Sequence, residues 1–377
     1  MNPTYPSDHG RPQNRRSFMR GVAGLCATVS GLGWSQVAKP AMPDTSALKK
    51  AARLNGTILA TFTGMHQLLY EPAASAMIAE TFSMIAVGND LKFSDRLRPT
   101  PDAFDFVFGD ADVSWAESHK MLIRAHCLVW WNALPTWFKS YVTIANARQV
   151  LTHHVTTVVK HYAGRVYSWD VVNEPIYHDN RVDGLRKKPW LDLIGAEYID
   201  LAFHAAADAD PHARLILNEC YIEHNTPVEI VRRDALLRLA TRLKKSGVPI
   251  TGIGVQGHLR GATPLDKAGM TTFCKQVRDL GLEIMVTELD VDSVNVAGTV
   301  LDQTAASQCG AFLDIMAPYA KVITLEALRE EPSIPKQPDG LRPYSNLFDG
   351  NYKPTPSYSA AVQALERSAA EMAKRHT

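Results

Sequence analysis

The sequence lacks most of the features that assign a function at first sight. Lys and Arg number 40 and Asp and Glu number 39 among 377 residues, so no net field draws in nucleic acid or an anionic membrane. The five cysteines lie apart without CxxC spacing, which argues against a zinc knuckle and a disulfide scaffold. The segment "TFTGMHQ" after the first β-type run lacks the G-x-G-x-x-G fingerprint of dinucleotide-binding folds. What remains is a soluble composition, 46% hydrophobic, that can bury a sizeable core.

The N-terminus carries a basic pair followed by a short apolar run. Arg15-Arg16 precede roughly a dozen Gly- and Ala-rich residues, too few for a bilayer span, which needs about 20. The arrangement resembles a twin-arginine export signal, and the alternative is a disordered basic tail. We therefore expect residues 1–41 to be a signal segment without stable membrane insertion, and the protein to be periplasmic or secreted. The cleavage site stays undefined, because the candidate sites lack a small residue at −3.

From about residue 55 onward, short β-type runs alternate with amphipathic helical stretches, for example 147–163 and 232–247. Strands that alternate with helices predict a parallel sheet. Eight such repeats without a low-complexity linker predict one domain over residues 42–377, an α/β fold of the (β/α)8 TIM-barrel class rather than an open doubly wound sheet. The predicted strands are 56–62, 83–89, 121–130, 166–173, 214–219, 250–257, 283–289 and 321–328.

Polar side chains gather where the predicted strands end, and in a parallel barrel these ends form the active-site rim. Glu174 ends the fourth strand in "WDVVNEP", with Pro175 directly behind it, and Glu288 ends the seventh. Two carboxylates across such a rim are what glycoside hydrolysis requires, one to protonate the leaving oxygen and one to attack the anomeric carbon or activate water. The other polar residues at strand ends are Asn89, Asp90, Lys92, His126, Asn173, Asn218, Glu219, Gln256, His258 and Asp290.

Several segments together resemble glycoside hydrolase family 10, whose best-known members are endo-β-1,4-xylanases. "WDVVNEP", "GIGVQGHL" and "VTELDV" are similar to the signature segments of that family, in the same order and spacing. "AHCLVWWNALPTW" is similar to its third-strand segment, and "NLFDGNYKPTPSYSA" to its C-terminal segment. The likeness covers essentially the whole chain after the signal region.

The resemblance implies a retaining mechanism with Glu174 as general acid/base and Glu288 as nucleophile, their carboxyl groups ~5–5.5 Å apart. His258 would hydrogen-bond to Glu288, and Asp290 would orient His258. Asn173 would bind the 2-hydroxyl of the sugar at the cleavage point. The remaining sugar-binding positions that the resemblance implies are Asn89, Lys92, His126, Trp130 and Gln256. We expect a polysaccharide or oligosaccharide substrate, no cofactor, no metal and a monomer.

The chain departs from the family pattern at positions that face the sugar. It reads Gly88-Asn89-Asp90-Leu91-Lys92 where the family has Glu-Asn-Glu-Met-Lys. Trp131 and Ala133 stand where a His and a Gln are usual. Glu326 stands where the family has a tryptophan that covers the cleavage subsite, which removes stacking area and adds a carboxylate beside the catalytic pair. We expect Glu326 to face the sugar, and the alternative is an ion pair with Arg329.

The sequence therefore predicts a retaining, endo-acting β-1,4-glycosidase similar to endo-1,4-β-xylanases. One alternative is a family member that acts on another β-linked polysaccharide, such as a decorated or bacterial exopolysaccharide. Another is a sugar-binding relative with weak catalysis, which the Glu174 and Glu288 pair disfavours because a binder needs neither. A metal-dependent barrel hydrolase is disfavoured as well, since no His/Asp ligand cluster is recognisable. His153 and His154 lack HExxH spacing and are expected at the surface of a helix.

Overall fold

The computed structural model describes residues 44–177, 181–292, 296, 300–329 and 344–375, so the predicted signal segment lies outside the described residues. Within the unit Met42–Thr377, eight parallel strands close into a barrel, because β1 pairs with β2 on one side and with β9 on the other. The predicted (β/α)8 barrel is confirmed, and each predicted run overlaps one barrel strand. In order around the barrel, the strands are β1 (Ile58–Thr63), β2 (Met84–Val87), β3 (Leu122–Ala125), β4 (Ser168–Asn173), β5 (Arg214–Glu219), β6 (Gly252–Val255), β8 (Glu283–Asp292) and β9 (Ala320–Leu325).

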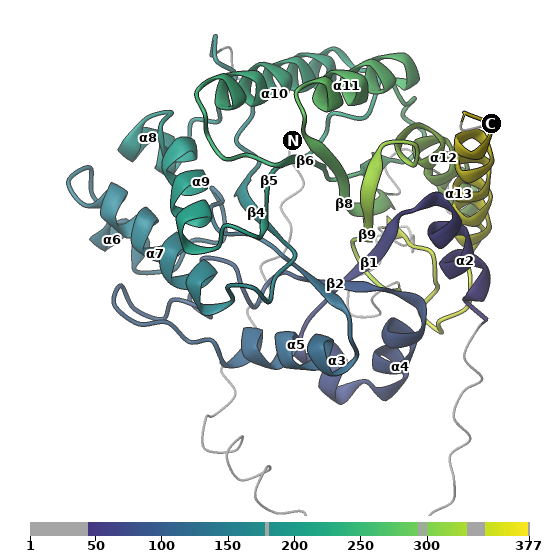
Figure 1. Cartoon of the computed structure of the whole chain (residues 1–377), viewed down its shortest axis with the longest axis horizontal. Coiled ribbons are helices and arrows are strands. Elements are labelled where there is room, and N and C mark those ends of the chain that lie inside the picture. The colour runs from purple at the N-terminus through teal and green to yellow at the C-terminus, as the bar shows by residue number, and fades with distance from the viewer. Residues whose placement is uncertain (1–43, 178–180, 293–295, 297–299, 330–343, 376–377) are drawn as a thin grey trace, which may run out of the picture. The chain divides into compact units, whose positions relative to one another are not determined.

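Helices surround the strands, as Figure 1 shows. The helix predicted at 232–247 begins earlier, at Pro227, because the Thr226 hydroxyl caps it by accepting a hydrogen bond from the Glu229 amide at 3.2 Å. No helix among the described residues is long and apolar enough to cross a membrane. The helices are α2 (Ser46–Asn55), α3 (Met65–Tyr70), α4 (Pro72–Thr81), α5 (Val107–Ser118), α6 (Phe138–Tyr141), α7 (Ala147–His161), α8 (Pro189–Ile194), α9 (Tyr198–Ala209), α10 (Pro227–Lys245), α11 (Lys267–Asp279), α12 (Leu301–Met316) and α13 (Pro356–Arg375).

The predicted surface position of His154 is wrong. His154 is fully buried and stacks on Phe93 with ring centroids 4.1 Å apart. It lies three residues after Leu151 and four before Val158, so it belongs to the apolar stripe of α7 that faces the barrel. Burial holds the pKa of His154 well below its ordinary value, so this imidazole is neutral and acts as a packing residue.

Two short strands extend the barrel rim where the polar side chains gather. β7 (His258–Arg260) pairs in parallel with the end of β8, which places His258 opposite Asp290. β10 (Tyr344–Ser345) pairs antiparallel with the same end of β8. The ten residues of β8 therefore run from the barrel wall to the rim, and they carry Glu288 within a fixed sheet rather than on a free loop.

The barrel core is apolar in one layer and charged in another. Its apolar layer consists of Ala60, Met84, Ile216, Met285 and Val322, which form one buried cluster. Arg124 on β3 and Asp170 on β4 are also fully buried, and they form an ion pair with each other. Burial of an unpaired charge is costly, so each of these two side chains needs the other as its partner inside the barrel.

Candidate active site

Glu288 lies at the centre of the rim, with donors on both carboxylate oxygens. Asn218 donates from Nδ2 to Oε1 at 2.7 Å, and His126 Nδ1 lies 3.7 Å from the same oxygen. His258 Nε2 lies 3.4 Å from Oε2. Only 7% of Glu288 is exposed, so these contacts act with little screening by water.

The surroundings of Glu288 favour its anionic form. Burial by itself raises the pKa of a carboxyl group, because it disfavours the charge. The charge of His126, the hydrogen bond from His258 and the more distant Arg124 outweigh burial and hold the pKa of Glu288 well below its ordinary value. Glu288 is therefore ionised at neutral pH, which is the form a carboxylate nucleophile requires.

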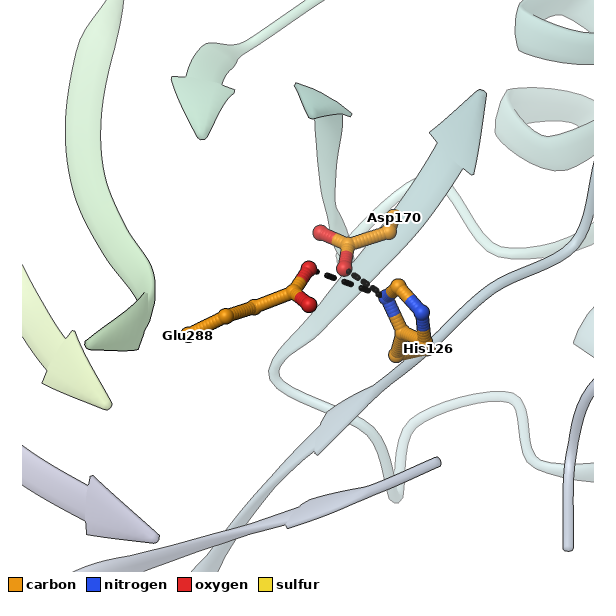
Figure 2. A group of neighbouring side chains, drawn as sticks. All are labelled: His126, Asp170 and Glu288. Atoms are coloured by element: carbon orange, nitrogen blue, oxygen red, sulfur yellow. Dashed lines mark hydrogen bonds and ion pairs between the residues drawn. The ribbon is translucent and has the colours of Figure 1, made fainter. Parts of the chain in front are cut away.

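His126 connects Glu288 to the buried ion pair of the barrel. Figure 2 shows its Nδ1 between Asp170 and Glu288, with Asp170 Oδ2 at 2.7 Å. Burial lowers the pKa of His126, but its neighbours, above all Cys127 and Glu288, raise it to about 10. His126 is consequently an imidazolium at neutral pH. Sequence reasoning missed Arg124 and Asp170, although a charged residue inside a predicted barrel strand was an available signal.

His258 supports the other oxygen of Glu288. Its Nδ1 bonds Asp290 Oδ1 at 2.8 Å, which directs Nε2 toward Glu288. Burial lowers the pKa of His258, but Asp290 and Glu288 raise it well above its ordinary value. The arrangement expected of His258 and Asp290 is thus present in the structure.

Glu174 reaches the rim from the end of β4 in an uncommon backbone conformation. Its φ of 52° lies in the left-handed region, which side chains rarely adopt. The strain is held by two hydrogen bonds, from the Glu174 amide to the Asn218 carbonyl and from Arg186 Nε to the Glu174 carbonyl, both 2.8 Å. Trp131 Nε1 donates to Oε2 of the carboxyl at 2.8 Å. The turn therefore presents this carboxyl group in a fixed orientation.

A network of amides joins the two glutamates. Asn218 Nδ2 donates to Asn173 Oδ1 at 2.9 Å as well as to Glu288. Gln256 Nε2 lies 3.2 Å from Asn173 Oδ1 and 3.4 Å from Glu174 Oε1. The sequence left Asn218 undecided, and its place at a strand end was the available signal. Gly254 leaves room for this network, because a Cβ there would lie 2.1 Å from Asn218 Oδ1.

Comparison with known proteins identifies the family. The model of glycosyl hydrolase family 10 matches residues 47–364. The chain belongs to glycoside hydrolase family 10. It is 30% identical over 322 residues to endo-1,4-beta-xylanase 2 of Claviceps purpurea, which covers 82% of this chain and 91% of that protein. The crystal structure of native xylanase 10B from Thermotoga maritima matches with a TM-score of 0.76 and 30% identity, over 86% of this chain and 99% of that one.

A second solved structure supports the same assignment. Xylanase 10B from Thermotoga petrophila RKU-1, in complex with xylobiose, matches with a TM-score of 0.75 and 30% identity, over 85% of this chain and 98% of that one. The chain is accordingly a glycoside hydrolase similar to endo-xylanases.

In this family 10 hydrolase, Glu326 lies beside Glu288. A carboxylate oxygen of Glu326, a carboxylate oxygen of Glu288 and a ring nitrogen of His258 lie within 4.8 Å of one another. Burial, followed by the charge of Glu288, raises the pKa of Glu326 to about 8. Its Oε2 is buried and has no hydrogen-bond partner among the described residues. Arg329, the alternative partner, bonds Glu71 Oε2 at 3.0 Å.

A cavity of about 410 Å³ opens beside Glu288 at the barrel mouth. Lys92 donates to Asn89 Oδ1 at 3.0 Å, and its Nζ lies 5.2 Å from the Trp130 ring. Trp130 itself lines an adjoining hollow with Asn173 and Glu174. The residues predicted to bind sugar that line the main cavity are Asn89, Lys92, His126 and Glu326. All predicted site residues thus lie in one connected region.

Among the residues that the structure describes, three groups of side chains bring His and carboxylate atoms close enough to hold a metal ion. The groups are His126–Asp170–Glu288, Glu223–His224–Glu229 and His258–Glu288–Glu326. In the second, Glu223 accepts from the amides of Gly257 and Ile222, and His224 Nε2 accepts from the Arg260 amide. These hydrogen bonds tie the group to the segment that carries His258, and His224 Nε2, which accepts one of them, has no lone pair left for an ion.

Proposed function

We propose that this family 10 enzyme is a retaining, endo-acting β-1,4-glycosidase that cleaves xylan-type polysaccharide without a cofactor or metal. Glu288 attacks the anomeric carbon, and Glu174 first donates and later withdraws a proton. The amide network carries the proposal, because it ties both carboxyl groups to Asn173. Two carboxyl groups that must act on opposite sides of one bond need such a fixed relation.

The two glutamates have the different environments that the two roles demand. Glu288 is surrounded by imidazolium groups and an amide, which stabilise its charge before attack. Glu174 has donors on Oε2 but only the long 3.4 Å contact on Oε1, which leaves Oε1 available to a leaving oxygen. Asn173 would bind the 2-hydroxyl of the sugar, an interaction that strengthens in the oxocarbenium-like transition state.

The substrate class rests on the relatives and on the cavity. The similar proteins named above are xylanases, and the cavity beside Glu288 offers Asn89, Lys92, His126 and Glu326 to sugar hydroxyls. The test is a panel of β-linked polysaccharides with the purified chain, in which viscosity and reducing ends are followed together. A rapid fall in viscosity with few new reducing ends on xylan supports endo-acting cleavage. Activity confined to other β-linked polysaccharides would refute xylan as the substrate.

The stereochemical outcome tests the mechanism separately. Proton NMR of the first product should show the β-anomer before mutarotation, because two displacements restore the configuration. Initial α-anomer would show an inverting enzyme and would remove Glu288 from the role of nucleophile.

We also propose that residues 1–41 export the enzyme by a twin-arginine pathway. The support is the Arg15-Arg16 pair before a short apolar run. Replacing both arginines by lysine keeps the positive charge but removes the pair that a receptor reads, so the enzyme should stay in the cytoplasm. Unchanged periplasmic or secreted yield would contradict this signal type.

A further inference from the structure

The two carboxyl oxygens of Glu174 have unequal surroundings. Oε2 accepts a 2.8 Å hydrogen bond from Trp131 Nε1, and Nη2 of Arg186 lies 3.7 Å away from the same oxygen. Oε1 has a 3.4 Å contact with Gln256 Nε2, and that amide lies closer to Asn173 Oδ1, at 3.2 Å. One oxygen is therefore held from two sides, while the other is held weakly.

Both neighbours of Oε2 can only donate hydrogen bonds. An indole N–H has no lone pair in the ring plane, and a guanidinium has no acceptor. A proton on Oε2 would weaken the hydrogen bond from Trp131 and the attraction to Arg186, because a protonated oxygen is a poorer acceptor than a carboxylate oxygen. These two neighbours therefore favour the proton of Glu174 on Oε1. We propose that Trp131 is a positioning residue that keeps the catalytic proton of Glu174 on Oε1 and stabilises the carboxylate left after that proton is donated. This inference rests on the proposed acid/base role of Glu174.

Trp131 is itself held in place. The guanidinium of Arg186 and the Nζ of Lys188 each lie 4.9 Å from the centroid of its ring. Trp130 meets it edge to face at 5.9 Å. Cations against the ring face are attracted by its quadrupole, so the ring resists rotation. The indole N–H is thus directed at Glu174 before substrate binds.

The residue type decides what this position can do. The family usually has a histidine here, and an imidazole nitrogen donates or accepts depending on its tautomer. The indole of Trp131 donates only, so it fixes the choice of oxygen on Glu174. The ionisable groups that face Glu174 are Arg186, Lys188, Glu219, Cys220 and Arg232. Of these, Glu219 can change its charge near neutral pH, because burial raises its pKa to about 7.

The first test replaces the indole by a smaller ring without an N–H, in Trp131→Phe, and follows Glu174 directly. Carbon NMR of δ-labelled glutamate, assigned with Glu174→Gln, gives the titration midpoint of this carboxyl separately from that of Glu219. Loss of a donor to the anion should raise the midpoint by about one to two pH units, since this hydrogen bond stabilises the ionised form. Trp131→His, which can donate again, should restore it. An unchanged midpoint in Trp131→Phe overturns the proposal.

A matched control removes another indole donor. Trp137 Nε1 donates to the Arg98 carbonyl at 2.8 Å, away from Glu174, so Trp137→Phe reports the effect of a lost N–H on stability alone. Its Glu174 midpoint should equal that of the wild type. A shift of the same size in Trp137→Phe would show a general effect on the fold and would also overturn the proposal.

The second test is kinetic and uses two aryl β-xylobiosides. In Trp131→Phe, kcat/KM for a phenyl leaving group should fall about 10–100-fold, because departure needs the proton. For a dinitrophenyl leaving group it should fall less than about 3-fold, since that departure needs no proton. The alkaline limb for the phenyl substrate should move to higher pH. Equal losses on both substrates indicate a structural role and overturn the proposal. A wild type that cleaves neither refutes the proposed function, and the NMR titration then decides the role of Trp131.

Discussion

Replacing Glu326 by glutamine should make the protein more stable at alkaline pH, with little gain near pH 5. The pKa of Glu326 is raised from 4.5 to about 8, mainly by burial and then by the charge of Glu288. The unfolded chain ionises this group above pH 4.5, whereas the folded protein must keep it protonated up to about pH 8. Wild-type stability therefore falls as pH rises through this window, and glutamine, which is neutral throughout, removes that fall.

The size of the effect follows from the displaced pKa of Glu326. Each pH unit between 4.5 and 8 corresponds to about 1.4 kcal/mol, so the full cost approaches about 5 kcal/mol above pH 8. Between pH 5 and pH 8 the difference in unfolding free energy between variant and wild type should grow by about 2–4 kcal/mol.

The assay is urea unfolding followed by tryptophan fluorescence at pH 5, 6, 7 and 8. Glu366→Gln provides the matched control, since Glu366 is exposed on α13 and the same chemical change there should leave the pH dependence as in the wild type. A difference between Glu326→Gln and wild type that stays constant across the four pH values would refute the reasoning. It would show that Glu326 is ionised in the folded protein at neutral pH.

Three further substitutions test the site. Glu288→Ala should abolish turnover. Added azide should restore it with an inverted product, because a small anion can enter the space of the lost nucleophile. Wild-type-like activity in this variant would exclude Glu288 from the role of nucleophile. Glu174→Ala should slow substrates with poor leaving groups by about 10²–10⁴-fold and activated aryl glycosides far less; equal losses would make Glu174 structural. Asn218→Ala should lower kcat more than it raises KM, by about 10-fold or more, since it removes a 2.7 Å hydrogen bond to Glu288; an unchanged kcat would contradict this.

The alternation of strand and helix was enough to predict the barrel, but not where every strand ends. The run predicted as a strand from 121 to 130 is a strand only over Leu122–Ala125. Cys127, Leu128 and Val129 are buried outside the strand, and the amides of Leu128 and Val129 donate hydrogen bonds to the backbone of β4. Hydrophobicity records burial, and a buried loop and a buried strand have the same composition.

The sequence predicted those site residues whose position follows from their own neighbours in the chain. It did not predict residues that matter only through a contact with a distant part of the chain. Glu174 directly follows the end of β4 and precedes Pro175, and Glu288 lies in β8 just past its pairing with β6, so the place of each near the rim was predictable from the local sequence. Arg124 and Asp170 form an ion pair beside His126 only because β3 and β4 pair in parallel, and neither residue shows this in its local sequence. The contact of Trp131 with Glu174 likewise depends on a loop path that no local pattern specifies.

The charges around Glu288 help to explain why the neighbouring carboxyl group of Glu326 stays protonated. Three groups are cationic at neutral pH, and three carboxylates balance them. The cations are Arg124, His126 and His258, and the anions are Asp170, Glu288 and Asp290. Ionisation of Glu326 would add an unbalanced charge in a buried place, which is why its pKa rises while that of Glu288 falls. Two glutamates within reach of the same histidine thus reach opposite protonation states, because burial disfavours the charge of both and the surrounding cations outweigh burial only at Glu288.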